Sequence, residues 1–269
     1  MNPVDSTAAP LVLRCNANHV VTLTLNRPQA RNALSTELIA ALQAELDAIA
    51  MDTSLHVVVL AGAGSAFCAG HDLKEIRAAG YAPEYAEALF EACSQLMQRI
   101  VSLPQPVIAR VQGIATAAGV QLVASCDLAI AADTARFATP GVNIGLFCST
   151  PMVALSRNIS PKHAMQMLLT GELMDAATAL RFGLINTLVP AAELDAAVDH
   201  LANKIASKSR HTLTMGKAAF YRQAELPLAQ AYDYAKDVMV TNLQIQDAQE
   251  GIGAFIDKRT PIWCHGANP

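Results

Sequence analysis

Alternating apolar and threonine positions begin the patterned part of the chain. Val21, Leu23 and Leu25 alternate with two threonines, a period of two that predicts a half-buried strand. Ser35 then precedes an apolar stripe at helical spacing, which predicts an amphipathic helix over residues 35–50 with Ser35 as its N-cap. The uninterrupted apolar run at 57–60 predicts a buried strand.

The same succession of strand, turn and helix recurs further along the chain. Strand patterns occupy residues 106–111, 127–131 and 184–189, and a helix is expected to begin near Ala117 after a turn of small residues. Strands that alternate with turns and modest helices predict an α/β core with parallel strand pairing.

The strand patterns stop near residue 190. Residues 191–257 show helical spacing only, with an apolar stripe between Leu228 and Leu243. We therefore divide the chain into an α/β core at 1–190 and a helical region at 191–269. Such a region must pack on its own core or on a neighbouring subunit, and we expect it to mediate oligomerisation.

Composition narrows the class of protein. The 269 residues are 52% hydrophobic and 16% charged, which suits one substantial domain with an appendage. A net charge of −4 argues against a nucleic-acid partner. No apolar run approaches the roughly 18 residues of a membrane span. The first ten residues show no leader pattern, so the sequence predicts a cytoplasmic protein without a membrane partner.

Cysteine and histidine spacing predicts neither disulfides nor a metal site. The six cysteines form no C-x-x-C pair, and a chain of this length needs no disulfide scaffold, so free thiols are expected. The seven histidines show no spacing typical of metal ligands.

Two turns rich in glycine and alanine carry the candidate chemistry. They span residues 62–74 and 112–121, and each follows a predicted buried strand. Small residues let a ligand approach the backbone, and the start of a helix offers unpaired N–H groups. An oxyanion that develops on a thioester carbonyl requires fixed donors of this kind. Each turn taken alone is also compatible with an ordinary connection.

Seven dispersed segments give the chain a family resemblance. They are NRPQARNAL at 26–34, AFCAGHDLKE at 66–75, the turn at 113–122, CDLAIA at 126–131, FATPGVNIGL at 137–146, LTGELMDAATALRFGLI at 169–185 and GAFIDKR at 253–259. In order and spacing the chain resembles the crotonase (enoyl-CoA hydratase/isomerase) superfamily over residues 11–263. The segments AGHDLKE and ATAAGVQLVASCD further resemble mitochondrial enoyl-CoA hydratase domain-containing proteins.

The resemblance implies a fold, a substrate and an assembly. The fold is a crotonase-type spiral of β-β-α units with a C-terminal helical trimerisation region, and the assembly is a homotrimer or a dimer of trimers. The substrate is an acyl-CoA thioester bound by the core at 1–190, with coenzyme A as part of the substrate and no covalently bound cofactor. The oxyanion donors would be the backbone N–H groups of His71 and Ala118.

Coenzyme A contacts follow from the same resemblance. They fall on the first loop, on the second loop and on the last helix, the last of these often serving a neighbouring subunit. The residues are Ala30, Arg31, Ala69, Gly70, Asp72, Leu73, Lys74, Phe255 and Lys258. For Lys74 and Lys258, a solvated surface lysine is an equally open interpretation.

The chain departs from the family at both catalytic carboxylates. Family hydratases place one glutamate three residues beyond the second oxyanion donor, where this chain has Gln121. The second follows the proline of an F-x-x-P-E run, where this chain has Gly141. A glutamine amide cannot exchange a proton at useful pKa values, and each general acid–base group contributes on the order of 10²–10⁴-fold. Hydration by the two-glutamate mechanism is therefore disfavoured.

Three hypotheses for function remain from the sequence. The first is an enzyme that stabilises a thioester enolate in the oxyanion hole. The second is a catalytically silent acyl-CoA binder or oligomeric partner. The third is a decarboxylase-like member, because decarboxylating relatives also carry a G-H-D run and work without the glutamate pair. The His71 side chain either acts on the substrate or is satisfied within its loop.

Overall fold

The computed structural model describes residues 9–265, so most of the segment searched for a leader lies outside the described residues. Within this range the strands form two sheets. The larger sheet has the order β1 (Val12–Ala17), β2 (Val20–Leu25), β3 (Val57–Gly62), β5 (Val107–Val111), β7 (Leu128–Ala132) and β10 (Thr187–Val189). The smaller has the order β4 (Ala66–Cys68), β6 (Ile114–Thr116), β8 (Arg136–Ala138) and β9 (Met174–Asp175).

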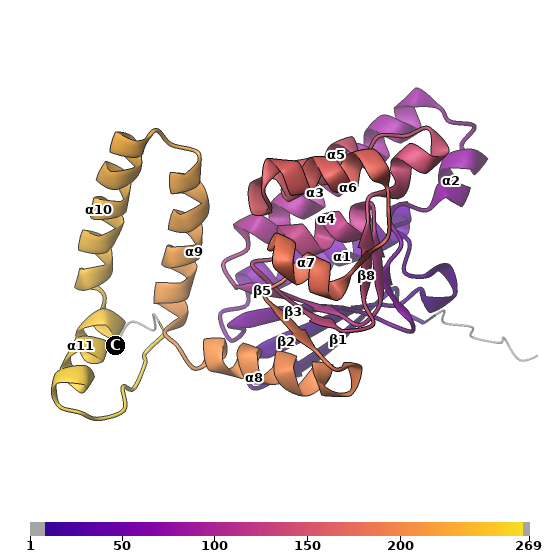
Figure 1. The fold of residues 1–269 in the computed structure, drawn as a ribbon. Coiled ribbons are helices and arrows are strands. Elements are labelled where there is room, and N and C mark those ends of the chain that lie inside the picture. The colour runs from indigo at the N-terminus through magenta and orange to yellow at the C-terminus, as the bar shows by residue number, and fades with distance from the viewer. Residues whose placement is uncertain (1–8, 266–269) are drawn as a thin grey trace, which may run out of the picture.

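Helices surround both sheets (Figure 1). They are α1 (Thr36–Met51), α2 (Leu73–Ala78), α3 (Pro83–Ser102), α4 (Ala118–Ser125), α5 (Ser149–Asn158), α6 (Pro161–Thr170), α7 (Ala176–Phe182), α8 (Leu194–Ala206), α9 (Arg210–Ala224), α10 (Leu228–Gln244) and α11 (Gln246–Ile256). The 3₁₀ turns are η1 (Pro28–Ala30), η2 (Pro140–Ile144) and η3 (Ala191–Glu193).

The predicted spiral of β-β-α units is confirmed. In the pairs β3–β4, β5–β6 and β7–β8, the first strand joins the larger sheet and the second joins the smaller sheet. Each pair is followed by a helix that returns the chain to the next unit. The pairings among β2, β3, β5, β7 and β10 are parallel, as are those among β4, β6 and β8. Every turn of the spiral therefore places a short connection between the two sheets.

The first elements form where the apolar pattern predicted them. β2 alternates between buried and half-buried positions, and β3 is buried along its whole length because both faces of the larger sheet are covered. Ser35 caps α1 by accepting a hydrogen bond from the Leu38 amide. The strand expected at 184–189 is shorter than predicted, because regular pairing with β7 begins only at Thr187. Just before it, the Asn186 side-chain oxygen accepts from the Ala129 amide, and the Asn186 amide donates to the Ala129 carbonyl.

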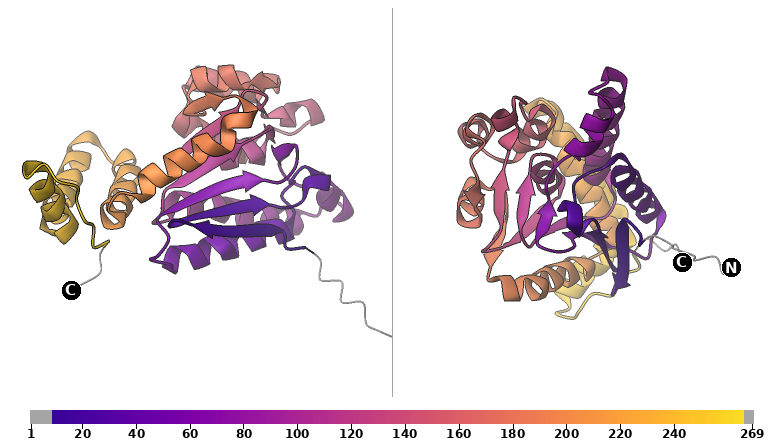
Figure 2. Two further views of the ribbon diagram at one scale, coloured as in Figure 1. Left: turned by 90° about the horizontal axis from the view of Figure 1, so that it is seen from below. Right: turned by 90° about the vertical axis from the view of Figure 1, so that its right-hand side faces the viewer.

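The helical region divides into two parts that the sequence did not separate. α8 lies across the larger sheet and buries Leu194, Val198 and Ala202 against β3, β5 and β7. α9, α10 and α11 follow α8 at one end of the molecule, where α9 contacts the core through side-chain hydrogen bonds and α10 and α11 lie beyond it (Figures 1 and 2). The predicted boundary at residue 190 thus follows the end of the strands, whereas the packing assigns α8 to the core. Oligomerisation through 191–269 stays a prediction.

None of the helices within residues 9–265 has the length and apolar character to cross a membrane.

Candidate functional site

A buried asparagine holds the first loop, residues 27–34, against the second loop, residues 62–74. Asn32 is fully buried, and its Nδ2 lies 2.8–3.1 Å from the carbonyl oxygens of Ala63, Ala66 and Phe67. Its Oδ1 accepts a hydrogen bond from the Arg27 amide at 2.9 Å. Because a buried amide with all its partners is a rigid support, the loop at 27–34 is fixed beneath the chain that leads into β4.

The second loop continues this pairing and leaves one amide unused. The Ala69 amide donates to the Arg31 carbonyl at 3.0 Å, and the Leu34 amide donates to the Gly70 carbonyl at 2.7 Å. The Asp72 amide then donates to the Leu34 carbonyl at 3.0 Å. No hydrogen bond found within residues 9–265 uses the intervening amide of His71.

The third loop, residues 112–117, ends in a strained residue just before α4. Ala117 has φ 50° and ψ −116°, a conformation that is costly for any residue with a Cβ atom. Its amide is held by the Ala138 carbonyl at 2.9 Å. Ala118 follows as the first residue of α4, where an amide has no partner within the helix. The strain therefore fixes the direction from which this free N–H emerges.

The second and third loops are packed against each other through glycines. A Cβ atom on Gly70 would lie 3.0 Å from Ala117 Cβ and 3.5 Å from the Ala118 nitrogen. A Cβ atom on Gly119 would lie 2.1 Å from the Cys68 carbonyl oxygen, so only glycine fits there. The two predicted donors, His71 and Ala118, therefore belong to neighbouring loops whose backbones are in close contact.

The His71 side chain is neutral and sits in an apolar setting. Its ring meets the Phe90 ring edge to face, with centroids 5.3 Å apart, and its Nε2 is buried without a hydrogen-bond partner. Burial lowers the pKa of His71 to about 4. Phe90 comes from α3 and was not singled out from the sequence, because nothing in that stretch marked it apart from a core position.

Asp72 is committed to a different partner. Its carboxylate forms an ion pair with Arg27 at 2.9 Å and also accepts from the Lys74 amide as the N-cap of α2. Burial would raise the pKa of Asp72, but the hydrogen bonds and charge of Arg27 outweigh it and hold the pKa below its usual range. Asp72 therefore links the first loop, through Arg27, to the start of α2. The Arg27 contribution was missed in the sequence.

The two positions at which family hydratases hold catalytic carboxylates are both uncharged in this chain and closely surrounded. Gln121 is buried on α4, and its Oε1 has no hydrogen-bond partner. A Cβ atom on Gly141 would lie 2.7 Å from the Leu146 carbonyl oxygen and 3.0 Å from Cys148 Sγ. A glutamate cannot be accommodated at residue 141 unless the turn after η2 moves.

The predicted coenzyme A contacts fall into two groups in the structure. Those of the first and second loops lie together, since Ala69 bonds to Arg31 and Leu34 bonds to Gly70. Leu73 and Lys74 are exposed at the start of α2 beside them. Phe255 and Lys258 are exposed at the end of α11, on the opposite side of the molecule from α2 (Figure 1). The structure does not bring these last two residues to the site within one chain.

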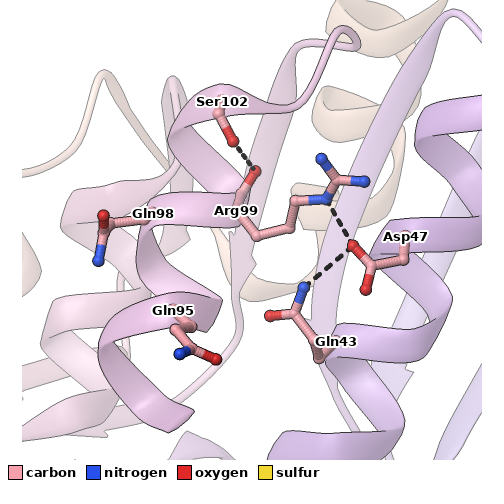
Figure 3. A pocket seen from close by; sticks show the side chains of 6 residues that line it. All are labelled: Gln43, Asp47, Gln95, Gln98, Arg99 and Ser102. Carbon is pink, nitrogen blue, oxygen red and sulfur yellow. Dashed lines mark hydrogen bonds and ion pairs between the residues drawn. The ribbon is translucent and has the colours of Figure 1, made fainter. Parts of the chain in front are cut away.

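The cavity in Figure 3 lies elsewhere, between α1 and α3. It has a volume of about 330 Å³ and is lined by polar side chains only. The Asp47 carboxylate is bound there by Arg99 at 2.8 Å and by Gln43 at 3.1 Å. These charges compensate each other between two solvated helix faces, so the cavity offers no chemistry beyond that of a surface. Within residues 9–265 no group of three or more potential ligands is arranged to hold a metal ion.

The pKa of His71 makes a measurable prediction for stability against pH. The folded protein keeps this ring neutral down to about pH 4, whereas an unfolded chain protonates it near 6.5. Stability from this group is thus present above pH 6.5 and is lost as the pH falls towards 4, by up to about 3 kcal/mol. In His71→Ala, the free energy of unfolding should fall less steeply over this window.

Denaturant unfolding at a series of pH values measures this difference. His200→Ala, which removes an exposed histidine on α8, should keep the steep dependence of the parent. Parallel curves for the parent and His71→Ala would contradict the buried, neutral imidazole.

Comparison with known proteins gives consistent matches over nearly the whole chain. The sequence model of the enoyl-CoA hydratase/isomerase family matches residues 16–266. A Xenopus laevis protein named enoyl-CoA hydratase domain-containing protein 3, mitochondrial, is 46% identical over 256 residues, covering 95% of this chain and 87% of that protein.

Two solved structures also superpose closely. An enoyl-CoA hydratase from Mycobacterium smegmatis gives a TM-score of 0.93 at 52% identity and covers 95% of this chain and 99% of that one. The human enoyl-CoA hydratase domain-containing protein 3 gives a TM-score of 0.90 at 44% identity and covers 94% of this chain and 100% of that one.

The same comparison corrects one prediction. The Xenopus relative and its rat, mouse and human counterparts are all named mitochondrial, which contradicts a cytoplasmic location. The prediction rested on the absence of a leader pattern in the first ten residues. Such an absence does not determine the compartment in which a protein works.

Proposed function

Because the chain belongs to the enoyl-CoA hydratase/isomerase family, we propose that it binds an acyl-CoA thioester with the carbonyl oxygen between the amides of His71 and Ala118. The observation that supports this most directly is the close packing of two loops whose amides at these positions are unused. Fixed N–H donors stabilise negative charge as it develops on the oxygen, because they need no reorganisation. The bound thioester then gains acidity at its α-carbon, and an enolate is the species favoured by this site.

Hydration by two glutamates is not part of the proposal. Gln121 and Gly141 offer no carboxylate, and the segments 113–126 and 137–149 contain no Asp, Glu, Lys or Arg. Gln121 can orient a water or a substrate group but cannot take its proton. Coenzyme A enters as part of the substrate, along the loops at 30–31 and 69–74.

A catalytically silent acyl-CoA binder is the second candidate, favoured by the same absence of carboxylates. Turnover assays on a panel of acyl-CoA thioesters separate the two candidates. An enzyme converts at least one thioester to product, whereas a binder shows affinity without product.

Binding through the carbonyl can be tested without turnover. A thioester and the matching S-alkyl-CoA thioether differ only in the carbonyl group, so their affinity ratio reports on its hydrogen bonds. Two hydrogen bonds of about 1 kcal/mol each predict that the thioester binds roughly 10- to 50-fold tighter in calorimetric titration. Equal affinity of butanoyl-CoA and S-butyl-CoA would contradict the oxyanion hole while leaving coenzyme A binding intact.

We also propose that the chain self-associates, as a trimer or a dimer of trimers, through its C-terminal helices. Large apolar side chains are exposed there, notably Phe220, Leu228, Tyr232 and Phe255, the last of which is 85% exposed. Exposed apolar surface of this extent is typical of an interface. Phe255 and Lys258 would then reach the coenzyme A site of a neighbouring copy. Analytical ultracentrifugation should give three or six copies, and a monomer at micromolar concentration would rule the proposal out.

A further inference from the structure

Three histidine rings form one stack between the core and the end of the described chain. His19 lies in the turn between β1 and β2, His56 directly precedes β3, and His265 follows α11. The ring centroids of His19 and His56 are 4.6 Å apart with nearly parallel planes, and those of His56 and His265 are 4.5 Å apart. The core fixes the first two rings, because the His56 amide donates to the His19 carbonyl at 2.7 Å. The third ring joins them from the other end of the chain.

The stack holds both ends of the connection between α8 and α9, residues 207–209. His56 Nδ1 lies 3.1 Å from the carbonyl oxygen of Ala206, the last residue of α8. The amide of Arg210, the first residue of α9, donates to His265 Nδ1 at 3.4 Å. The Arg210 guanidinium also donates to the His265 carbonyl at 3.2 Å. The rings therefore join the two helices to the core at the point where the chain passes from one to the other.

Residues 262–265, which we name the C-terminal strap, carry the third ring. Trp263 Nε1 donates to the carbonyl oxygen of Ser207 at 2.9 Å. The Cys264 amide donates to the Asp247 carboxylate at 2.7 Å, and Asp247 is buried near the start of α11. The strap thus lies along the connection 207–209, and its position depends on a small number of polar contacts and on the stacked ring.

The surroundings of the stack favour neutral rings. Burial lowers the pKa of both His56 and His265, and the neighbouring imidazoles and Arg210 act in the same direction. The charges that act on the stack within residues 9–265 are the Arg210 cation and the Asp247 carboxylate, which balance each other only while the rings are neutral. Asp247 opposes the shift of His265, and the Ala206 carbonyl opposes that of His56, without reversing either.

Protonation of His265 also removes a hydrogen bond. Both ring nitrogens of an imidazolium are donors, so a protonated His265 cannot accept from the Arg210 amide. The added charge would lie at the amino-terminal end of α9, where the helix dipole disfavours a cation. A second proton on the adjacent His56 would place two like charges at ring centroids 4.5 Å apart.

We propose that the stack of His19, His56 and His265 is a pH-sensitive attachment, which holds the C-terminal strap on the α8–α9 connection at neutral pH and releases it on protonation. This inference goes beyond the proposed function and does not depend on acyl-CoA binding. Both shifted pKa values are lowered, so the attachment is complete above pH 6.5 and is lost as the pH falls below it. Lys217 still binds Asp127 in the open state, so the release is local and the core stays folded.

A single fluorophore reports on the strap. Trp263 is the only tryptophan of the chain, and it is half-buried against the connection 207–209. Titration of the full chain from about pH 8 to about pH 4 should shift its emission to longer wavelength, with a midpoint below pH 6.5. Far-UV circular dichroism over the same range should stay constant through the midpoint, because only the strap is released.

Variants assign the transition to the stack. His265→Asn keeps an acceptor near the position of Nδ1 and cannot be protonated, so the emission shift should be lost. His19→Phe keeps an aromatic ring against His56 without a charge, and the midpoint should fall by about one pH unit. His200→Ala, at an exposed position on α8, should keep the transition of the parent.

Three outcomes would overturn the inference. The first is a parent whose emission is independent of pH, and the second is a transition that is unchanged in both His265→Asn and His19→Phe. The third is a transition that coincides with the loss of circular dichroism, because Trp263 would then report global unfolding. If His265→Asn already emits at long wavelength at neutral pH, the strap is free in that variant, and the midpoint of His19→Phe decides. Titrations without ligand keep every outcome separate from that of the thioester binding tests.

Discussion

Gly119→Ala is expected to destabilise the protein and to disable its proposed oxyanion hole, although alanine is normally the better residue in a helix. The added Cβ atom would lie 2.1 Å from the carbonyl oxygen of Cys68 and 2.9 Å from its carbon. Both are backbone atoms of β4, so no side-chain rotation relieves the overlap. Overpacking of this kind typically costs 1–3 kcal/mol or more, and we expect about 3 kcal/mol in the free energy of unfolding.

The same displacement acts on the proposed donors. Cys68 leads into the loop of His71, and Gly119 directly follows Ala118, so separating these two backbones moves one N–H away from the other. A misplacement of about 1 Å can cost on the order of 10²-fold in rate. We expect the preference for butanoyl-CoA over S-butyl-CoA to disappear in the variant.

Gly216→Ala is the matched control for this substitution. Gly216 lies inside α9 on an exposed face, and a Cβ atom there would meet nothing within 4 Å. The change should raise the free energy of unfolding by about 0.5–1 kcal/mol through helix propensity and reduced freedom of the unfolded chain. If Gly119→Ala matched Gly216→Ala in stability and in ligand preference, the close approach of α4 to β4 would be wrong.

Local patterns were sufficient to predict the elements with the strongest periodicity. Helix α1 was predicted as 35–50 and spans Thr36–Met51, because its cap and its stripe both lie in the sequence. Strand β3 was predicted from a run that is apolar because helices cover both sides of the sheet. Helix α3 was not predicted, although Leu89, Cys93, Leu96 and Ile100 are buried at helical spacing. The helical spacing of these residues was visible in the sequence, but the partner against which they pack, α1, was not.

The candidate site required more than local pattern. Each of the two turns of small residues is ambiguous by itself. Only the resemblance to a family predicted that both turns contribute to one site. The support beneath them could not be read from the sequence, because Asn32 and Arg27 bond to residues 31–45 positions further along the chain.

The role of Asp127 illustrates how a charge near a motif can be structural. In the sequence it is only the first residue of the strand predicted at 127–131. In the structure its carboxylate binds the Val107 amide at 2.7 Å, Lys217 Nζ at 2.7 Å and the Tyr221 hydroxyl at 2.9 Å. Lys217 and Tyr221 come from α9, so this carboxylate attaches the C-terminal helices to the core.

Lys217→Met should therefore be among the most destabilising single changes in the chain. Lys217 Nζ is nearly buried and also donates to the carbonyl oxygens of Ile100 and Gln105, both at 3.0 Å. Burial lowers the pKa of Lys217, and Asp127 opposes that shift, so the charged form of Lys217 depends on the Asp127 carboxylate. Removing the cation leaves the partly buried Asp127 carboxylate with its hydrogen bonds to Val107 and Tyr221 but without its counter-charge. Breaking a fully buried pair typically costs about 3–5 kcal/mol, so the lower end, about 3 kcal/mol, applies here. We expect a loss of this size in denaturant unfolding at fixed protein concentration.

Two further variants distinguish a charge effect from a packing effect. Lys236→Met removes an exposed lysine of α10 that lies 3.6–3.7 Å from two aspartates, and it should change stability by less than about 0.5 kcal/mol. Adding Asp127→Asn to Lys217→Met removes the uncompensated charge, so the double variant should recover part of the loss, because residues of one network do not act additively. A double variant as unstable as the sum of the two single ones would show that α9 is held by packing alone. We expect a recovery of about 1 kcal/mol or more, because the two side chains stabilise each other. Such a recovery would identify the ion pair as the attachment of the C-terminal helices.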